Sequence, residues 1–291
     1  MAALTISYVQ IDVFTSQALT GNPLAIFPDA RALSDEQMQA LARETNLSES
    51  TFVFPRPADV EARDGVKVRI FTPREEFPFA GHPTLGTAFY LHSLSGAACV
   101  ELDLPVGKIP VHFSLDEDGL TLGEMRQRDP EFGPMYPPAA IAEATGLPLK
   151  ELDSSLPIQK VSTGLPFILI PLRSTECLDR LRLDFARFGE SLGEPGIKPY
   201  FVVRQPEGFR ARMIFYQGED PATGSAAGCC AAWAVRHGIL ESGRRAVIEQ
   251  GAAIHRPSRI FIRAERAGDA VTNVCAGGHC VPVFRGEAQL S

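Results

Sequence analysis

The sequence predicts an α+β protein of two similar lobes, each a β-barrel-like mixed sheet wrapped around a central helix. Many short strand-like runs occur with about one long helix per group of strands, a rhythm that does not fit alternating βαβ units. Two segments of small residues, Gly81–Leu91 and Gly218–Ala234, occupy corresponding places in two halves of similar length. Between the halves, the proline-rich segment Asp129–Pro138 is the clearest break in composition.

This break divides the chain into two predicted domains. The N-terminal lobe covers residues 1–128 and is joined by a C-terminal strand at about 278–287, and the C-terminal lobe covers residues 129–277. A chain of 291 residues, 45% hydrophobic and 22% charged, has enough interior for two domains of medium size.

Composition also limits the partners and the compartment. With a net charge of −7 and no basic block, the chain is not expected to bind nucleic acid. The first residues lack a basic and then apolar leader, and no segment approaches ~18 uninterrupted apolar residues, so we predict a cytoplasmic protein without membrane association. The six cysteines form no C-x-x-C pair and no zinc-like spacing with histidine, so we expect buried thiols and no metal site.

The first half is predicted to open with a hairpin followed by a helix. Alternating apolar residues predict a strand at Ile6–Phe14, and a Thr-Gly-Asn-Pro turn leads to the apolar run Leu24–Phe27. Ser34 and Gln37 have the spacing of a capping box, which predicts a helix over about 35–45. Further strands are expected at 51–54, 66–71, 98–102, 108–113 and 120–124.

The second half is predicted to repeat this mixture. Helices are expected at 139–145 and near 178–192, and a third helix follows Asp220 and stops at Gly238. The segment 277–284 closes the chain as a strand that could return to the first lobe. Other strands are expected at 158–162, 167–171, 200–203, 209–216, 247–250 and 258–264.

The two small-residue segments share the frame [HD]-P-x-x-G-[ST]-A when His82 is laid over Asp220. Each begins a helix whose first backbone N–H groups have no partner within the helix, which favours binding of a carboxylate or phosphate. We interpret the match as a duplicated lobe with both helix starts facing one cleft. The alternative is two unrelated helix starts that use proline in the first turn, which is common.

Acid–base chemistry on a carboxylate-bearing substrate fits the residues near these helix starts. Glu49 lies at a predicted helix-to-strand junction, and His82, Asp220 and perhaps Glu219 accompany it. No G-x-S-x-G elbow, P-loop or G-x-G-x-x-G is present, and Ser225 has no histidine partner nearby in the sequence. Each candidate also has a plain structural interpretation: Glu49 as a solvated carboxylate, His82 as a donor to a loop carbonyl, and Asp220 as a helix N-cap.

Motifs spread over nearly the whole chain resemble those of the PhzF family of phenazine-biosynthesis isomerases, within the diaminopimelate-epimerase-like superfamily. The matching segments are Gln10–Phe27, Asn46–Phe54, Arg69–Ala88, Glu219–Gly228, Gln250–Gly251, Arg256–Ser258 and the GGHCVPVFRG near the end. The resemblance implies a diaminopimelate-epimerase-like fold with the active site between two lobes. It also implies an isomerase without a cofactor, usually a homodimer.

The resemblance also assigns roles. In PhzF proper, the glutamate of the NLSE-type segment moves a proton between carbons of trans-2,3-dihydro-3-hydroxyanthranilate, and that residue is Glu49 here. By the same carry-over His82 and Asp220 are catalytic. The predicted substrate contacts are Gly81, Thr87, Gly224, Ser225 and Ala226.

One departure from the wider superfamily bears on the reaction. The amino-acid epimerases carry a cysteine at each helix start, where this chain has Ala80 or Gly81 and Asp220, so racemisation by two thiols is disfavoured. The alternatives left open are an amino-acid or hydroxy-acid racemase or epimerase that uses Glu49 with Asp220 or His82, and a carboxylate-binding protein without catalysis.

Overall fold

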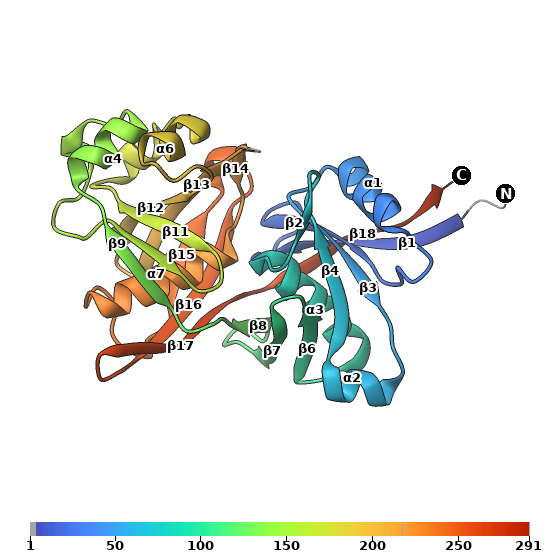
Figure 1. Ribbon diagram of the computed structural model, residues 1–291. Coiled ribbons are helices and arrows are strands. Elements are labelled where there is room, and N and C mark those ends of the chain that lie inside the picture. The colour runs from blue at the N-terminus through green and yellow to red at the C-terminus, as the bar shows by residue number, and fades with distance from the viewer. Residues whose placement is uncertain (1–3, 217, 291) are drawn as a thin grey trace. The chain divides into compact units, whose positions relative to one another are not determined.

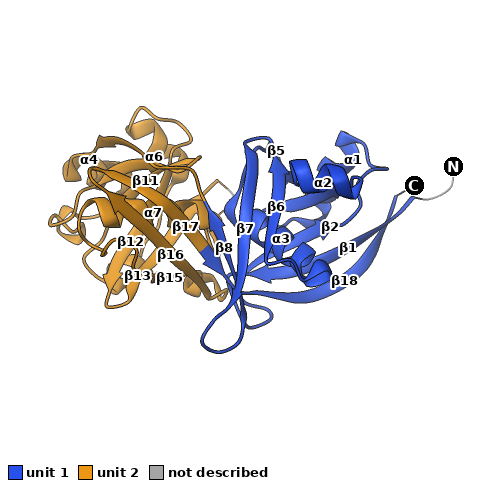
Figure 2. Ribbon diagram, turned by 90° about the horizontal axis from the view of Figure 1, so that it is seen from below, with its two compact units in different colours: residues 1–126, 277–291 blue, residues 127–276 orange. Residues whose placement is uncertain are grey.

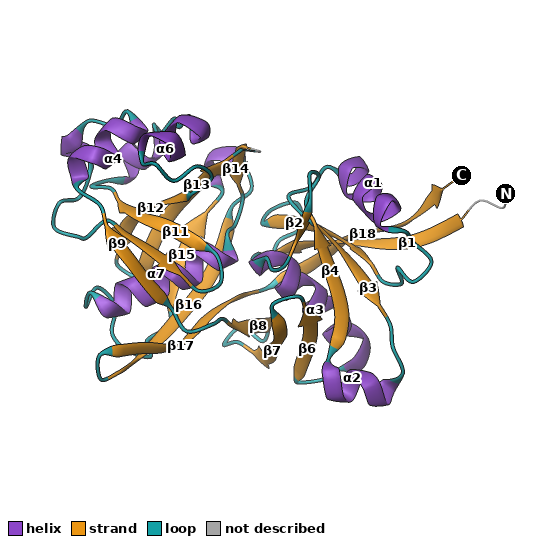
Figure 3. Ribbon diagram, viewed as in Figure 1, coloured by secondary structure: helices purple, strands orange, loops and turns teal. Residues whose placement is uncertain are grey.

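The chain is a mixed α+β protein, as the sequence predicts (Figure 1, Figure 3). The structure is a computed structural model and describes residues 4–216 and 218–290. Its contacts divide into two compact units (Figure 2). Unit 1 comprises the described residues through Arg126 and those from Gly277 onward, and unit 2 comprises those from Gln127 to Ala276.

Unit 1 is built on a mixed sheet with α3 as its longest helix. Its helices are α1 (Asp35–Thr45), α2 (Ala58–Asp64) and α3 (Gly81–Ser95). Its strands are β1 (Leu4–Val13), β2 (Asn22–Phe27), β3 (Ser50–Phe54), β4 (Val66–Phe71), β5 (Glu76–Phe77), β6 (Cys99–Leu104), β7 (Gly107–Leu115), β8 (Thr121–Arg126) and β18 (Cys280–Leu290). α3 contacts β1, β2, β3, β6, β7 and β8, and β18 pairs antiparallel with β1.

Unit 2 likewise contains antiparallel and parallel strand pairs, with α7 as its longest helix. Its helices are α4 (Pro138–Thr145), α5 (Thr175–Asp179), α6 (Phe185–Ser191) and α7 (Gly224–Arg236), with short 3₁₀ turns η1 (Leu149–Glu151) and η2 (Ala252–Ile254). Its strands are β9 (Glu131–Met135), β10 (Gln159–Ser162), β11 (Pro166–Pro171), β12 (Lys198–Gln205), β13 (Gly208–Phe215), β14 (Gly218–Asp220), β15 (Ala246–Gln250), β16 (Ser258–Ala267) and β17 (Ala270–Gly278), which ends in unit 1. α7 contacts β10, β11 and β16.

The two units repeat one order of strand pairings. In unit 1 the pairs β1–β2, β2–β3, β3–β4, β4–β6 and β6–β7 are antiparallel and parallel in turn. In unit 2 the pairs β10–β11, β11–β12, β12–β13, β13–β15 and β15–β16 follow the same alternation. The short strands β5 and β14 add to β4 and β13, and each is followed by the long helix of its unit. Each long helix therefore begins just after a short strand.

α1 shows how local sequence sets an element of unit 1. The Ser34 hydroxyl accepts the Gln37 N–H and the Gln37 side chain accepts the Ser34 N–H, so the predicted capping box is present. The helix buries Met38, Leu41 and Ala42, which lie at helical spacing on one face. Its predicted bounds are confirmed.

Several elements of the structure differ from the predictions. The helix predicted near 178–192 is two short helices. The first ends where the Arg212 guanidinium donates hydrogen bonds to the backbone carbonyls of Leu178, Asp179 and Leu181. The second begins where the Asp184 carboxylate caps a new helix start. The helix α2 and most of β17 were not predicted. The closing strand is longer than expected, since β18 extends to Leu290.

One of the six cysteines is not buried. Cys99 is exposed, which corrects the expectation that all six thiols are buried; it lies at the start of β6, and the other five are buried. Within the described part of the chain, every helix is too short or too polar to cross a bilayer.

Candidate active site

Glu49 lies directly before β3 in unit 1, at the junction of helix and strand that the sequence predicts. α1 ends at Asn46 in the left-handed conformation, which turns the chain back toward β3. A 2.9 Å hydrogen bond between the Thr45 and Ser50 hydroxyls closes the short connection. The Glu49 side chain is 13% exposed, so it points into the unit and not into bulk solvent.

His82 is the second residue of α3, and its side chain contacts Glu49. The His82 Nδ1 atom lies 3.5 Å from Glu49 Oε2 and 3.3 Å from the Asn22 side-chain nitrogen. The imidazole is only 4% exposed, and its Nε2 atom has no hydrogen-bond partner among the described residues. A buried polar atom without a partner is unusual in a native structure, and its explanations include a catalytic role and an ordered water or ion.

Burial decides the charge of His82. Desolvation lowers the pKa of His82 to about 3, and a backbone interaction with Pro23 opposes this shift only in part. The imidazole is therefore neutral near pH 7, and its contact with Glu49 is a hydrogen bond or a close approach, not an ion pair. Whichever group Nδ1 binds, Nε2 is the nitrogen left for a ligand.

The other predicted contacts of unit 1 lie on the same helix. Gly81 is the first residue of α3, and Ala80 at the N-cap has no side chain that could accept a helix N–H. Thr87 is fully buried and donates its hydroxyl hydrogen to Thr51 of β3 at 2.9 Å. This bond ties α3 to the sheet, and the predicted substrate contact of Thr87 stays a prediction.

In unit 2, Asp220 ends β14 and is 7% exposed. Its Oδ2 atom accepts the Thr223 hydroxyl hydrogen at 2.6 Å, and its backbone carbonyl accepts from Gln250 Nε2 at 2.8 Å. The neighbouring Glu219 forms a buried, two-point ion pair with Arg212, at 3.0 and 2.6 Å. Arg212 thus neutralises Glu219, and a neutral hydroxyl donates to the Asp220 carboxylate.

The first residues of α7 are the predicted contacts Gly224, Ser225 and Ala226, and all three are buried. The N-cap is Thr223, and its side chain makes no cap hydrogen bond because its hydroxyl is directed to Asp220. The expectation that Asp220 is the N-cap is therefore wrong. The N-cap side chain therefore makes no bond to the first N–H groups of α7.

His82 and Asp220, which the sequence comparison aligned, do not occupy equivalent positions in the two units. α3 begins at Gly81 and α7 at Gly224, and each follows a short strand by the same interval. His82 therefore lies inside its helix, whereas Asp220 precedes its helix. The shared letters are mostly glycine, proline and small residues, which recur at helix starts for local reasons and can match out of register.

Three residues near these sites were missed as individual candidates. Asn22 contacts His82, and Thr223 and Gln250 hold Asp220. All three lie within motif segments that carry the family resemblance, which is the signal that could have found them.

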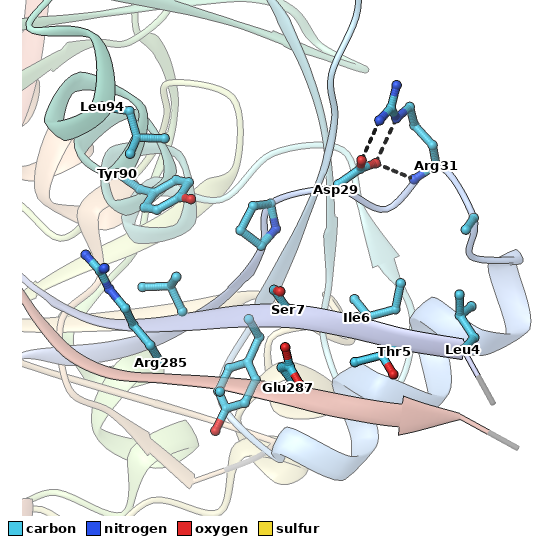
Figure 4. Close-up of a pocket in the computed structure, with 15 residues that line it drawn as sticks. Leu4, Thr5, Ile6, Ser7, Asp29, Arg31, Tyr90, Leu94, Arg285 and Glu287 are labelled. Atoms are coloured by element: carbon cyan, nitrogen blue, oxygen red, sulfur yellow. Dashed lines mark hydrogen bonds and ion pairs between the residues drawn. The ribbon is translucent and has the colours of Figure 1, made fainter.

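A metal centre and a groove elsewhere in the described structure are the alternatives to these two candidate sites. Residues 4–216 and 218–290 contain no group of three or more His, Cys, Asp or Glu side chains arranged to hold a metal ion. A groove of about 1090 Å³ lies in unit 1 along β1 and β18, between Tyr90 and Leu94 of α3 and the exposed Asp29–Arg31 ion pair (Figure 4). None of the predicted site residues lines this groove.

Comparison with known proteins gives the family. The model of a family described as "Phenazine biosynthesis-like protein" (PhzC-PhzF) matches residues 11–286. A trans-2,3-dihydro-3-hydroxyanthranilate isomerase of Pseudomonas aeruginosa is 37% identical over 286 residues, which cover 97% of this chain and 99% of that protein. The chain belongs to the PhzC-PhzF family. Since similar curated relatives of this PhzC-PhzF chain are named isomerases, it is an isomerase.

Solved structures agree with this assignment. A structure described as a "Predicted Epimerase" from Pseudomonas aeruginosa is 36% identical to this PhzC-PhzF chain, with a TM-score of 0.81 over 97% of this chain and 99% of the other. A PhzF-family protein of Bacillus anthracis superposes with a TM-score of 0.87 at 26% identity, covering 98% and 99%. The fold is therefore that of the PhzF proteins.

Proposed function

We propose that this isomerase moves a proton between two carbons of a small carboxylate-bearing substrate, a cyclic or unsaturated amino acid, with Glu49 as the acid/base shuttle. The observation that carries the proposal is the pair in unit 1: a largely buried Glu49 carboxylate within 3.5 Å of a buried His82 whose Nε2 has no described partner. Since several relatives are named for trans-2,3-dihydro-3-hydroxyanthranilate, that compound is the first substrate to test.

The reaction needs only a base that becomes an acid. The Glu49 carboxylate takes a proton from a C–H group, and the electron pair of that bond stays on the substrate. Protonated Glu49 then gives the proton to another carbon, so no oxidant or reductant is required. N–H groups at the helix starts bind the substrate carboxylate, and this favours the electron-rich state formed when the proton leaves.

His82 and Asp220 have different parts in the proposal. Neutral His82 forms a hydrogen bond to the substrate through Nε2 and supplies no positive charge, because its pKa is about 3. The Asp220 carboxylate accepts a hydrogen bond from a substrate ammonium or hydroxyl group. Gly81, Thr87 and the first turn of α7 complete the proposed contacts.

Deuterium incorporation tests the shuttle. The wild-type protein is incubated with trans-2,3-dihydro-3-hydroxyanthranilate in D₂O, and the product is followed by proton NMR. We expect Glu49→Gln, which keeps the size of the side chain and removes the base, to lower kcat by about 10²–10⁴-fold. Glu44→Gln is the matched control, because Glu44 is exposed on α1 and outside the site. Near-normal turnover by Glu49→Gln contradicts the proposal.

If that compound is not converted, a screen of cyclic and unsaturated amino acids follows with the same two variants. Uptake of deuterium that depends on Glu49 but not on Glu44 identifies the substrate. A compound that binds to the wild-type protein but is neither isomerised nor deuterated counts against the shuttle.

An epimerase is the second candidate, favoured by the 36% identical structure described as a predicted epimerase. Such a reaction needs a base on one face of the substrate and an acid on the opposite face. His82 is a poor acid because it is neutral, so the pair for this reaction is Asp220 as the base and protonated Glu49 as the acid. Inversion at the α-carbon in D₂O, measured by chiral chromatography, distinguishes this reaction from a proton shift between carbons.

We further propose a homodimer that works in the cytoplasm without a cofactor. We also propose the two domains that the sequence predicts, residues 1–128 with a strand at about 278–287, and residues 129–277. Light scattering of the purified protein tests the dimer. Activity that survives dialysis against a metal chelator tests the independence from metals.

A further inference from the structure

A buried polar cluster lies where β14 meets α7 in unit 2. It consists of Asp220, Thr223 of the connection, Gln250 at the end of β15 and Tyr200 of β12, and all four side chains are buried. Polar groups at this depth are destabilising unless they are hydrogen-bonded. The bonds that satisfy them therefore define how the cluster is arranged.

Gln250 is held by four contacts that fix its amide orientation. Its Oε1 accepts the Tyr200 hydroxyl hydrogen at 2.9 Å and the Thr223 backbone N–H at 3.3 Å. Its Nε2 donates to the Asp220 carbonyl at 2.8 Å and to the Thr223 hydroxyl at 2.9 Å. Burial raises the pKa of Tyr200 well above its ordinary value, so its hydroxyl remains a donor.

The hydrogen bonds of the cluster run from donor to acceptor toward the Asp220 carboxylate. The Thr223 hydroxyl accepts a hydrogen from Gln250 and gives its own hydrogen to Asp220 Oδ2 at 2.6 Å. A hydroxyl that already accepts one hydrogen bond becomes a stronger donor. The chain of donors from Gln250 through Thr223 therefore stabilises the ionised form of Asp220 and fixes one of its oxygens.

The residue after Gln250 fits the same arrangement. Gly251 has φ +80°, and a Cβ atom there would lie 2.2 Å from the Arg256 carbonyl oxygen and 2.6 Å from that of Pro221. Only glycine allows the strand end to lie this close to the connection that carries Asp220. The Gln250–Gly251 pair and the Asp220–Thr223 connection are thus fitted to each other, although they are far apart in sequence.

We propose that Thr223 and Gln250 are positioning residues, which keep the Asp220 carboxylate ionised and in a single orientation toward the substrate. This inference rests on the proposed function, in which Asp220 binds the substrate. It assigns Thr223 a role other than its helix cap, since its side chain makes no cap bond.

The first test needs no substrate. Protein labelled with ¹³C at the aspartate carboxyl groups is titrated by NMR, and Asp220→Asn assigns the Asp220 signal. We expect Thr223→Val, which keeps the shape and removes the hydroxyl, to raise the titration midpoint of Asp220 by about one pH unit. Thr223→Ser restores the midpoint. Thr145→Val is the matched control, because Thr145 is also buried in unit 2 but donates to the Ile141 carbonyl.

A midpoint that is the same in wild-type protein and in Thr223→Val overturns the proposal. If Thr223→Val does not fold, Gln250→Met is used, which keeps the length and removes all four contacts. It is expected to raise the midpoint of Asp220 in the same direction, and an unchanged midpoint again overturns the proposal.

The second test uses the substrate found by deuterium uptake. We expect Thr223→Val to move the acid side of the kcat/KM profile to higher pH and Thr223→Ser to move it back. The two tests separate the two proposals. If Thr223→Val shifts the midpoint of Asp220 but activity does not depend on Asp220, the positioning role is supported and the proposed function is contradicted. If activity depends on Asp220 but neither test shows a shift, the proposed function is supported and the positioning role is contradicted.

Discussion

The start of α3 in unit 1 and the start of α7 in unit 2 follow the same order of strands but differ in electrostatics. At α3, a neutral imidazole with an unsatisfied Nε2 lies beside the Glu49 carboxylate. At α7, the Thr223 hydroxyl, which accepts from Gln250, donates to the Asp220 carboxylate, and the charge of Glu219 is matched by Arg212. In the proposed function, the repeated backbone carries the proton shuttle in one unit and a substrate-binding charge in the other.

The difference suggests a division of labour. A base that moves protons needs a partner that does not hold it ionised, and neutral His82 fits that need. A carboxylate that binds a substrate donor needs a constant charge and direction, and this is the role we propose for the hydrogen bonds from Gln250 to Thr223 and from Thr223 to Asp220. Besides Glu49→Gln, the variants expected to lower activity most are therefore those that remove the charge of Asp220 and the hydrogen bond of His82.

Asp220→Asn and His82→Gln test this division directly. We expect Asp220→Asn to lower kcat/KM by about 10²-fold or more, because a charge-assisted hydrogen bond is lost. His82→Gln loses a neutral hydrogen bond, and about a 10-fold decrease is expected. Because His82 is neutral above about pH 4, His82→Gln should leave the shape of the pH profile unchanged from pH 5 to 9. A profile that loses one of its limbs in His82→Gln contradicts the neutral imidazole.

The pH dependence of stability gives the next largest effect. The pKa of His82 is near 6.5 in the unfolded chain and about 3 in the folded one, so below pH 6.5 the unfolded chain binds a proton that the folded chain does not. The free energy of unfolding should fall as the pH falls, by about 2 kcal/mol between pH 6.5 and 4.5.

Urea denaturation at several pH values measures this effect. His82→Gln should flatten the decrease, whereas His112→Gln, at an exposed site on β7, should leave it as in the wild type. An equally steep decrease in wild type and His82→Gln shows that His82 is protonated in the folded state.

How far the sequence predicts these features depends on the distance between the interacting residues. The bounds of α1 and β4 follow from a capping box and from β-branched and aromatic residues that are neighbours in the chain. The position of Glu49 at a helix-to-strand junction follows from the same local signals. The family and the isomerase class follow from motifs, whereas the catalytic roles of Glu49, His82 and Asp220 stay predictions.

Contacts between distant segments were not predictable in this way. Gln250 reaches Asp220 and Thr223 across about thirty residues, and Arg212 ends α5 from a strand far along the chain. The low pKa of His82 depends on the side chains packed around it, which no local pattern reveals. The mistaken overlay of His82 on Asp220 has the same origin, because a match of small residues does not set the register of a helix.

A glycine inside α7 offers a smaller effect on stability. A Cβ atom at Gly228 would lie 2.0 Å from Gln127 Oε1, and Gln127 bonds to the Gly224 carbonyl and the Thr163 hydroxyl. Gly228→Ala should therefore lower the free energy of unfolding by about 1–3 kcal/mol. The double variant with Gln127→Ala removes the clash, so its loss should be less than the sum of the two single losses. Strict additivity, measured by urea denaturation, shows that the side chains do not meet.

The smallest effect concerns helix starts that have no proposed ligand. α1 is capped by the Ser34 hydroxyl, whereas neither α3 nor α7 has a side-chain cap. Ser34→Ala should lower the free energy of unfolding by about 1 kcal/mol, and Ser93→Ala, an exposed serine of α3 that bonds only to the Tyr90 carbonyl in its own helix, by less than about 0.5 kcal/mol. If a helix start lacks a cap because it binds substrate, then substrate should raise the melting temperature of wild type and Ser34→Ala equally. If the rise in melting temperature caused by substrate is different in Ser34→Ala, substrate binds at α1. That result contradicts the idea that substrate binds only at helix starts without a side-chain cap.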